Sequence, residues 1–445
     1  MVSMRDTAMH LTLHYEDQPV ARVTADGDTL RLAYTPEWLE APHRFPISLS
    51  MPIRDVAFGQ EIALPWLMNL LPEGAPLRAM TRSLGASPDD VLGLIAETGG
   101  DLAGALNLVP RTHGSDYRPI PDEAALEQII EQLPARPFLA GEDGVAMSLA
   151  GAQDKLPVAL FEGRLAIPLH GSASTHILKP DNPRLYGSVQ NEALCMVLAR
   201  RSGLPTAEVT TGTAGSRHYL LVSRYDRIID QPVRRLHQED FCQALGLMPA
   251  AKYEFNGTGQ RGPSLADMFA LVRQHMTARD LTRLLDAAIF NIATGNVDSH
   301  AKNYSIHLDP AGPSLAPLYD LMSGLCLDGI TTNHAQAIGG QRRGAHIYAR
   351  HWQRMAEASG LSARGTTRRV VQLTARMLKE LPDSVAEVAA MPAGPAPLLT
   401  TFAKAIQTRI EEVHAHALKD GDTMDANDDD ESASLGATAY GSLGN

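Results

Sequence analysis

The chain has 445 residues, of which 44% are hydrophobic and 20% charged, and its formal net charge is −12 at pH 7. This length predicts two or three domains with a substantial core, and the composition is typical of an ordinary globular protein. The sequence shows no basic segment followed by an apolar run and no long uncharged stretch, which argues against secretion and a membrane span and favours a cytoplasmic protein.

The negative charge is concentrated near the C-terminal end. Seven of the 51 acidic side chains lie in residues 420–431, DGDTMDANDDDE, which leaves 44 against 39 Lys and Arg in the rest of the chain. We therefore expect residues 420–445 to form an acidic disordered tail on a mildly acidic body without a basic DNA-binding arm. Cys195, Cys242 and Cys326 are far apart in apolar contexts, which favours buried thiols over a disulfide framework or a zinc site.

The N-terminal part is expected to form a unit of about 112 residues. Residues 11–34 alternate in polarity around an Asp-Gly turn, which predicts a small sheet, and residues 65–106 read as helices. The turn-rich segment 111–123, RTHGSDYRPIPDE, is a candidate boundary.

The loop SLAGAQDKL begins at Ser148 and runs into a predicted strand. Small residues let backbone N–H groups approach phosphates closely, and Lys155 adds a positive charge, so a phosphate cradle and a simple turn are both consistent with this loop.

A short strand, THILK, ends at Lys179, and the segment VQNEALCMVLARRSGLP predicts a helix that carries Glu192 on an apolar face. A lysine at a strand end is usually solvated. However, a carboxylate on an apolar face needs a partner, which a lysine that contacts nucleotide phosphates would supply. The next predicted strand, HYLLVSRYDR at 218–227, either ends in surface charges or places Ser223 to Tyr225 against an adenine edge.

The stretch from Asp280 to Asp320 carries the densest chemistry. Helical spacing of apolar residues predicts a helix with Asp280 as its N-cap and Gly295 as its stop, followed by the loop NVDSHAKN at 296–303. Alternation from Tyr304 to Leu308, the turn DPAGP and a returning strand up to Tyr319 then predict a hairpin.

Such a hairpin would bring Asn303 and Asp320 to the same end, with their backbones roughly 5 Å apart. Mg²⁺ prefers oxygen ligands and typically takes one or two from the protein besides phosphate oxygens. Asp298 would stand beside the metal as a base, which is the layout of a phosphoryl-transfer site. The alternative is a loop that collects Asp, Asn and His as turn formers.

A series of segments resembles the HipA family of serine/threonine kinases, the toxins of bacterial type II toxin–antitoxin pairs. They are, in chain order, YTPEWLE, ISLSMP, NLLPEG, SLAGAQDK, THILK, NEALC, SRYDR, RLHQEDFCQALGL, KYE, DSHAKN and PLYD. The resemblance implies an α+β fold of the two-lobed protein-kinase-like type. Its expected parts are an N-terminal subdomain (1–112), a small lobe (113–232), a mostly helical C-terminal lobe with the catalytic loop (233–419) and the acidic tail (420–445).

The resemblance also implies residue roles. Asp298 matches the catalytic base, Asn303 and Asp320 match the Mg²⁺ ligands, and Lys179 matches the lysine that contacts ATP phosphates. Ser148 occupies the autophosphorylation position, where added charge would expel the loop and switch the kinase off. The other residues implied to bind ATP are Ala150, Gly151, Ala152, Gln153, Asp154, Lys155, Ser223, Arg224, Tyr225, His300, Ala301, Lys302, Asn303 and Tyr319.

The family further implies transfer of the ATP γ-phosphoryl group to a protein Ser or Thr, with an aminoacyl-tRNA synthetase as the expected substrate and translation as the inhibited process. It implies a HipB-like helix-turn-helix antitoxin, through which the protein contacts DNA indirectly. Asp154 and Ser223 depart from the family pattern, which has a frequent Glu and an acidic residue there. Two alternatives remain: a pseudokinase that acts as a corepressor beside the antitoxin, and a metal-dependent phosphohydrolase, which would need neither Lys179 nor an adenine-binding strand.

Overall fold

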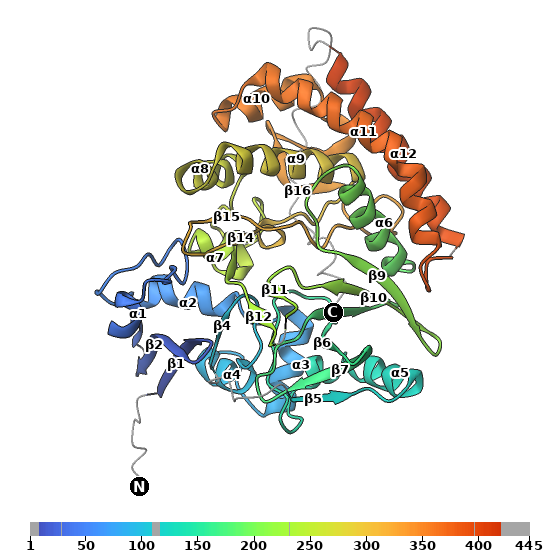
Figure 1. Cartoon of the computed structure of the whole chain (residues 1–445). Coiled ribbons are helices and arrows are strands. Elements are labelled where there is room, and N and C mark those ends of the chain that lie inside the picture. The colour runs from blue at the N-terminus through green and yellow to red at the C-terminus, as the bar shows by residue number, and fades with distance from the viewer. Residues whose placement is uncertain (1–8, 28, 109–115, 231, 396, 420–445) are drawn as a thin grey trace. The chain divides into compact units, whose positions relative to one another are not determined.

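The computed structural model describes residues 9–27, 29–108, 116–230, 232–395 and 397–419 (Figure 1). The predicted acidic tail and part of the predicted boundary at 111–123 lie outside the described residues. The chain divides into two compact units. Unit 1 comprises Met1–Lys179, Ser223–Pro249 and Ile306–Pro313, and unit 2 comprises Pro180–Val222, Ala250–Ser305 and Ser314–Asn445. Each unit combines segments from more than one of the domains predicted above.

Unit 1 begins with a small antiparallel sheet in the order β3-β2-β1-β4. Its strands are β1 (Met9–Tyr15), β2 (Gln18–Asp26), β3 (Thr29–Tyr34) and β4 (Leu106–Asn107), and its helices are α1 (Pro36–Glu40), α2 (Gln60–Met68), α3 (Gly74–Leu84) and α4 (Val91–Thr98). Alternate apolar residues such as Leu13, Val23 and Leu32 are fully buried, which is what a two-residue period produces. The sheet predicted for 11–34 and the helices predicted within 65–106 are confirmed.

The remainder of unit 1 contains four antiparallel strands in the order β5-β7-β6-β8. Its elements are β5 (Asp116–Pro119), α5 (Glu123–Gln132), η1 (Pro137–Leu139), β6 (Leu156–Phe161), β7 (Arg164–Leu169), β8 (His176–Pro180), β11 (Arg227–Ile228), β12 (Arg234–Arg235), β13 (Gln238–Asp240) and α7 (Phe241–Ala244). The strand predicted to present Lys179 is therefore confirmed as β8.

An ionic cluster lies in the interior of unit 1. It consists of Asp101, Arg224, Asp226, Arg227 and Arg235, each at most 6% exposed. The Asp101 carboxylate accepts from Arg224 at 3.2 Å and from Arg227 and Arg235 at 3.0 Å, and Arg224 also donates to Asp226 at 2.8 Å. Burial by itself would raise the pKa of Asp101, but the three arginines lower it to about 2. In this arginine–aspartate cluster Asp101 is therefore charged, and the three arginines outnumber the two aspartates by one.

Glu239 is a second buried carboxyl group in unit 1, and it leads to a pH prediction. It is 1% exposed and accepts from the Leu49 N–H at 2.8 Å. Burial raises its pKa to about 8, against the opposing effect of hydrogen bonds from Ser48 and Leu49. Because the folded pKa lies above the unfolded value of 4.5, the contribution of Glu239 to stability is fully present below pH 4.5 and is lost as the pH rises through about 8.

We expect Glu239→Gln to remove this pH dependence, because the amide keeps the acceptor oxygen and cannot ionise. At pH 8 the variant should be more stable than the wild type by roughly 2–4 kcal/mol, with little difference at pH 5. Urea unfolding at the two pH values measures this, with the exposed Glu37→Gln as the control. An equal difference at both pH values would contradict the assignment.

Unit 2 is mostly helical (Figure 1). Its helices are α6 (Ser188–Arg201), η2 (Pro249–Ala251), α8 (Leu265–His275), α9 (Ala278–Thr294), η3 (Ala301–Asn303), η4 (Gly344–His346), α10 (Ala349–Ala358), α11 (Ala363–Ala389) and α12 (Pro397–Leu418). Its strands are β9 (Val209–Ala214), β10 (Arg217–Ser223), β15 (Ser314–Leu315), β16 (Asn333–Ile338) and β17 (Gln341–Arg343). Strand β14 (Ser305–His307) begins at the last residue of the unit 2 segment Ala250–Ser305 and continues into the unit 1 segment Ile306–Pro313. The predicted helical region at 350–418 is confirmed. The strand predicted at 218–227 is present as β10 but ends at Ser223. No helix in the described ranges combines the length and apolar character that a membrane crossing requires.

Two local predictions need correction. Asp280 is not the N-cap of α9: Thr277 is, and the Asp280 carboxylate accepts from the Thr277 backbone and hydroxyl in a capping box. Because the two residues form a reciprocal pair, either could be taken for the cap from sequence. Cys326 is only partly buried, unlike Cys195 and Cys242. Gly295 does end α9, with a φ of 66° that favours glycine.

Candidate active site

The loop at 296–303 is held by the end of α9. The Asn296 side chain donates to Asn291 Oδ1 at 3.0 Å and accepts from the Asp298 N–H at 3.3 Å. The carbonyl of Asp298 accepts from the His300 N–H at 2.7 Å and from Asn303 Nδ2 at 2.8 Å. The residues predicted as base and metal ligand are thus joined directly by a hydrogen bond.

The Asp298 carboxylate is partly exposed and accepts a hydrogen bond from the Tyr253 hydroxyl. This bond orients one carboxylate oxygen. A partly exposed, oriented carboxylate is suited to receive a proton from a bound hydroxyl group. The motif KYE contains Tyr253, but the sequence predicted no role for this tyrosine. Only its position beside Asp298 in the structure indicates that it orients the carboxylate.

Tyr319 links the segments that carry Asn303 and Asp320, the two residues predicted to hold Mg²⁺. The Tyr319 hydroxyl donates to the Lys302 carbonyl at 2.7 Å and bonds to the Ser305 hydroxyl at 2.7 Å, so it ties the residue before Asp320 to Lys302 and Ser305, which lie on either side of Asn303 in the chain. Since Asn303 Nδ2 is engaged with Asp298, its amide oxygen is the atom that a cation would contact. Asp320 has a φ of 57°, and such strain in a residue with a side chain is common at functional sites.

His300 in the same loop is buried and packs edge-on against Tyr253 at 5.0 Å between ring centres. Burial lowers the pKa of His300 well below its usual value, Lys252 lowers it further and Asp320 raises it. His300 is therefore neutral near pH 7 and supports the loop without adding charge beside Asp320.

The hairpin predicted after the loop is present but short. Only β14 and β15 are regular strands, joined by a bond of 2.9 Å from the Ala316 N–H to the Ser305 carbonyl. The returning segment then leaves the hairpin, because the Leu318 N–H donates to the Pro205 carbonyl at 2.8 Å.

Ser148 and the predicted phosphate loop lie in unit 1. Ser148 is fully buried, and its hydroxyl donates to the Leu70 carbonyl at 3.1 Å while its N–H donates to the Asp101 carbonyl at 3.2 Å. The Gly151 carbonyl accepts from the Glu73 N–H at 3.1 Å. Gly151 has a φ of 111°, and a Cβ there would lie 2.6 Å from Lys155 Nζ. The loop is thus held closely against residues of the N-terminal subdomain.

The segment predicted to hold adenine also lies in unit 1. The Arg224 guanidinium donates to the carboxylates of the arginine–aspartate cluster, to the Ser174 hydroxyl at 2.8 Å and to the Leu102 carbonyl at 2.7 Å. Any contact of Arg224 with a nucleotide would therefore come from its backbone. Lys179 and Glu192 are both buried, but they belong to different units, and their ion pair stays a prediction.

Two domain families match the sequence: the HipA N-terminal domain over residues 11–109 and the HipA-like C-terminal domain over residues 147–384. This chain belongs to the HipA family. The resemblance that the sequence motifs indicated is confirmed.

Individual relatives support the assignment to the HipA family. The chain is 40% identical over 398 residues to "Putative kinase Y4mE" of Sinorhizobium fredii, covering 86% of this chain and 92% of that one. It is 33% identical over 406 residues to the serine/threonine-protein kinase toxin HipA of Shewanella oneidensis, covering 86% and 91%. A solved structure of Shewanella oneidensis HipA, in a complex with HipB and operator DNA, matches with a TM-score of 0.80 and 29% identity over 91% of this chain and 99% of that chain.

These matches confirm the predicted HipA kinase-like α+β fold. The relatives are named as a serine/threonine-protein kinase toxin and a kinase, so the family assignment places the chain among protein kinases. The phosphohydrolase alternative has no support from them.

Proposed function

We propose that the chain is a serine/threonine protein kinase toxin that transfers the γ-phosphoryl group of ATP to a hydroxyl group of a protein. The observation that carries the proposal is the Tyr253–Asp298–Asn303 arrangement, which presents an oriented carboxylate next to an amide oxygen in a loop that matches the family's catalytic loop. A structural asparagine turn would not require the tyrosine contact.

The chemistry follows from the residues. The substrate hydroxyl oxygen attacks the γ-phosphorus, its proton passes to Asp298, and the bond to the bridging oxygen breaks to release ADP. Asn303 and Asp320 would hold Mg²⁺, which neutralises phosphate charge when it is bound. Lys179 would contact the phosphates, with Glu192 as its ion-pair partner. Most of the rate enhancement would thus come from positioning and electrostatics.

The nucleotide would also contact the other residues assigned from the family. Ala150 to Lys155 would cover the phosphates through backbone N–H groups, and the backbone of Ser223 to Tyr225 would bind the adenine edge. His300, Ala301, Lys302 and Tyr319 would form the wall of the nucleotide site.

The proposed partners come from the family. An aminoacyl-tRNA synthetase is the proposed substrate, and its modification would inhibit translation. A HipB-like antitoxin is the proposed binding partner, with DNA contacted through it; the support is the similarity to the Shewanella HipA structure, whose complex contains HipB and operator DNA.

The proposal is tested by incubating the purified protein with Mg²⁺ and γ-labelled ATP and mapping the phosphate by mass spectrometry. We expect label on Ser148 in the wild type and none there in Ser148→Ala. The opposite result is a wild-type protein that binds ATP and has no earlier phosphate on Ser148 but still takes up no label. That result would overturn the kinase assignment and favour the pseudokinase corepressor.

Phosphorylation of Ser148 should release its loop. A phosphate adds roughly −1.5 to −2 charges and cannot occupy the fully buried site that the hydroxyl fills beside Leu70. We expect amide hydrogen exchange in residues 147–155 to become at least about tenfold faster in the phosphorylated protein than in Ser148→Ala treated in the same way. Unchanged protection would argue against the off-switch.

A further inference from the structure

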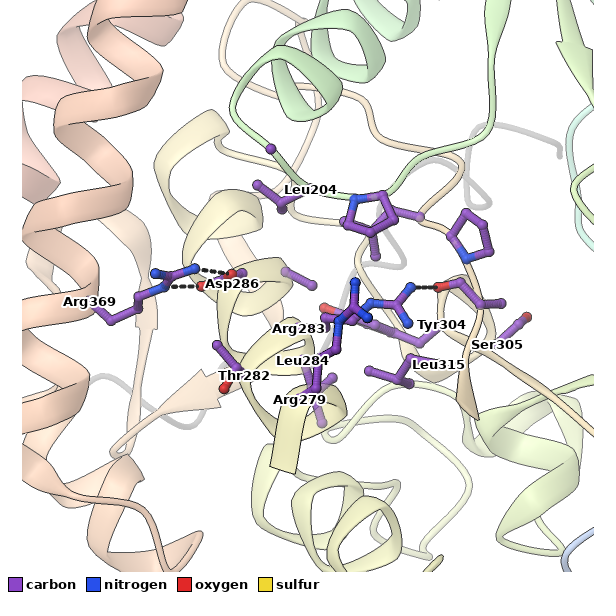
Figure 2. A pocket seen from close by; sticks show the side chains of 16 residues that line it. Leu204, Arg279, Thr282, Arg283, Leu284, Asp286, Tyr304, Ser305, Leu315 and Arg369 are labelled. Carbon is purple, nitrogen blue, oxygen red and sulfur yellow. Dashed lines mark hydrogen bonds and ion pairs between the residues drawn. The ribbon is translucent and has the colours of Figure 1, made fainter. Parts of the chain in front are cut away.

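A pocket of about 280 Å³ opens in unit 2, outside the catalytic loop (Figure 2). Its walls come from the segment after α6, one side of α9, the β14 and β15 strands and α11. It is lined by Gly203, Leu204, Pro205, Arg279, Thr282, Arg283, Leu284, Asp286, Ala287, Tyr304, Ser305, Leu315, Ala316, Pro317, Leu318 and Arg369. The volume lies at the lower end of the range for small-molecule sites.

The charges in this pocket do not balance. Three arginines line it against a single aspartate, Asp286, and both oxygens of that carboxylate are taken by Arg369 at 2.6 and 2.5 Å, as the dashed lines in Figure 2 show. Within the described part of the chain Arg279 has no hydrogen-bond or ion-pair partner, and its side chain is exposed. Arg283 is paired with Asp280, which does not line the pocket, so Arg279 is the cationic side chain of the pocket that has no counter-charge.

Arg283 offers further donors. Its guanidinium donates to Asp280 at 3.3 Å and to the Ala316 carbonyl at 3.2 Å, which leaves three of its five N–H groups. Arg279 lies one helical turn before it on α9, and burial together with the charge of Arg279 lowers the pKa of Arg283, partly offset by Asp280. An anion placed between the two arginines would relieve their repulsion.

Apart from Thr282, Tyr304, Ser305 and the Asp286–Arg369 pair, the rest of the pocket lining is apolar. Leucine, proline and alanine side chains form the walls around the two guanidinium groups, which is the combination of apolar lining and few polar groups found in ligand sites. We propose that this pocket binds a small organic anion, whose carboxylate or phosphate head lies on Arg279 and Arg283 and whose apolar body lies against the leucines.

The pocket is connected to the metal site. Ser305 follows Asn303 by two residues, and Leu318 precedes Asp320 by two, so the pocket walls are the segments that carry both predicted metal ligands. Arg283 braces this region through its bond to the Ala316 carbonyl. A bound anion would keep Arg283 in contact with the Ala316 carbonyl and so favour the metal-binding arrangement. This regulatory consequence rests on the proposed function.

Binding is tested by calorimetric titration of the full chain with phenyl phosphate and phenylacetate, with benzyl alcohol as the uncharged probe and a saturating non-hydrolysable ATP analogue with Mg²⁺ to block the nucleotide site. The anion that binds more tightly identifies the head group. Arg279→Gln should raise its Kd about tenfold, as expected for one lost charge-assisted contact, and Thr282→Glu should do the same by repulsion. The exposed Arg368→Gln on α11 is the matched control and should leave the Kd unchanged.

Three results would overturn the proposal. They are no binding of either anion, equal binding of benzyl alcohol, or equal effects of Arg279→Gln and Arg368→Gln. A fourth result would change the occupant. If the D428N/D429N/D430N variant bound the probe about tenfold more tightly than the wild type, the acidic segment of the chain itself would be the competing occupant. The assignment of the pocket to a small molecule would then be wrong. None of these measurements needs turnover, so they stand apart from the test of kinase activity.

The regulatory consequence has its own readout. Electron paramagnetic resonance measures the affinity of the protein for Mn²⁺ in the presence of the non-hydrolysable nucleotide. This affinity should rise at least about fivefold when the anion is saturating, and the gain should be absent in Arg283→Gln. Equal affinities with and without the anion, while the anion itself binds, would refute the coupling and leave the binding site intact.

Discussion

Replacing Asp298 by alanine should lower the rate of phosphoryl transfer by a factor of roughly 10² to 10⁴, the range for loss of a general base. The carboxylate is oriented by the Tyr253 hydroxyl, and its backbone carbonyl, which the variant retains, holds Asn303. The metal ligand should therefore stay in place, and the loss should appear in kcat while the KM for ATP changes little. Single-turnover assays with γ-labelled ATP measure the chemical step directly.

Two further variants sharpen this result. Asp298→Asn keeps the shape and the contact with Tyr253 but accepts a proton poorly, so it should be about as defective as the alanine variant. Tyr253→Phe removes only the orienting bond and should cost roughly tenfold or less, on the order of one hydrogen bond. Near-normal transfer by Asp298→Asn would show that Asp298 is not the base.

Replacing Asp101 by alanine should destabilise the folded protein by roughly 3–5 kcal/mol, because breaking a buried ionic network leaves unpaired charge in the interior. In the variant, Arg224 and Arg227 would keep Asp226 as their acidic partner, whereas Arg235 would lose its ion pair with Asp101. Urea unfolding at pH 7 measures the change in the free energy of unfolding. The exposed Asp55→Ala is the control and should stay within about 0.5 kcal/mol of the wild type.

The pH dependence provides an independent check on Asp101. Its pKa in the folded protein is about 2, below the unfolded value of 3.8, so its stabilisation is present above pH 3.8 and is lost as the pH falls through about 2. The difference in stability between wild type and Asp101→Ala should therefore shrink across this interval. A difference that stayed constant would indicate that the alanine acts through lost packing instead of lost charge.

The sequence alone determined the elements and the family. Apolar spacing predicted α9 and the strands β8 and β10 because burial of one face imposes a period on the chain, and Gly295 marked the end of α9 because a left-handed residue stops a helix. The short motifs, read in order, indicated the HipA family and its catalytic loop.

Tertiary structure decided which side chains meet. Tyr253 reaches Asp298 from 45 positions earlier, and Asp101 meets Arg224 across 123 positions, contacts that no local pattern encodes. The role of Asp280 changed for the same reason: a polar residue has several possible partners in sequence, and only folding selects one. Arg279 and Arg283 line a pocket with residues of the β14 and β15 segments, an arrangement that the spacing of residues on α9 does not encode. Sequence periodicity reports burial, whereas a site depends on distances between residues that the fold brings together.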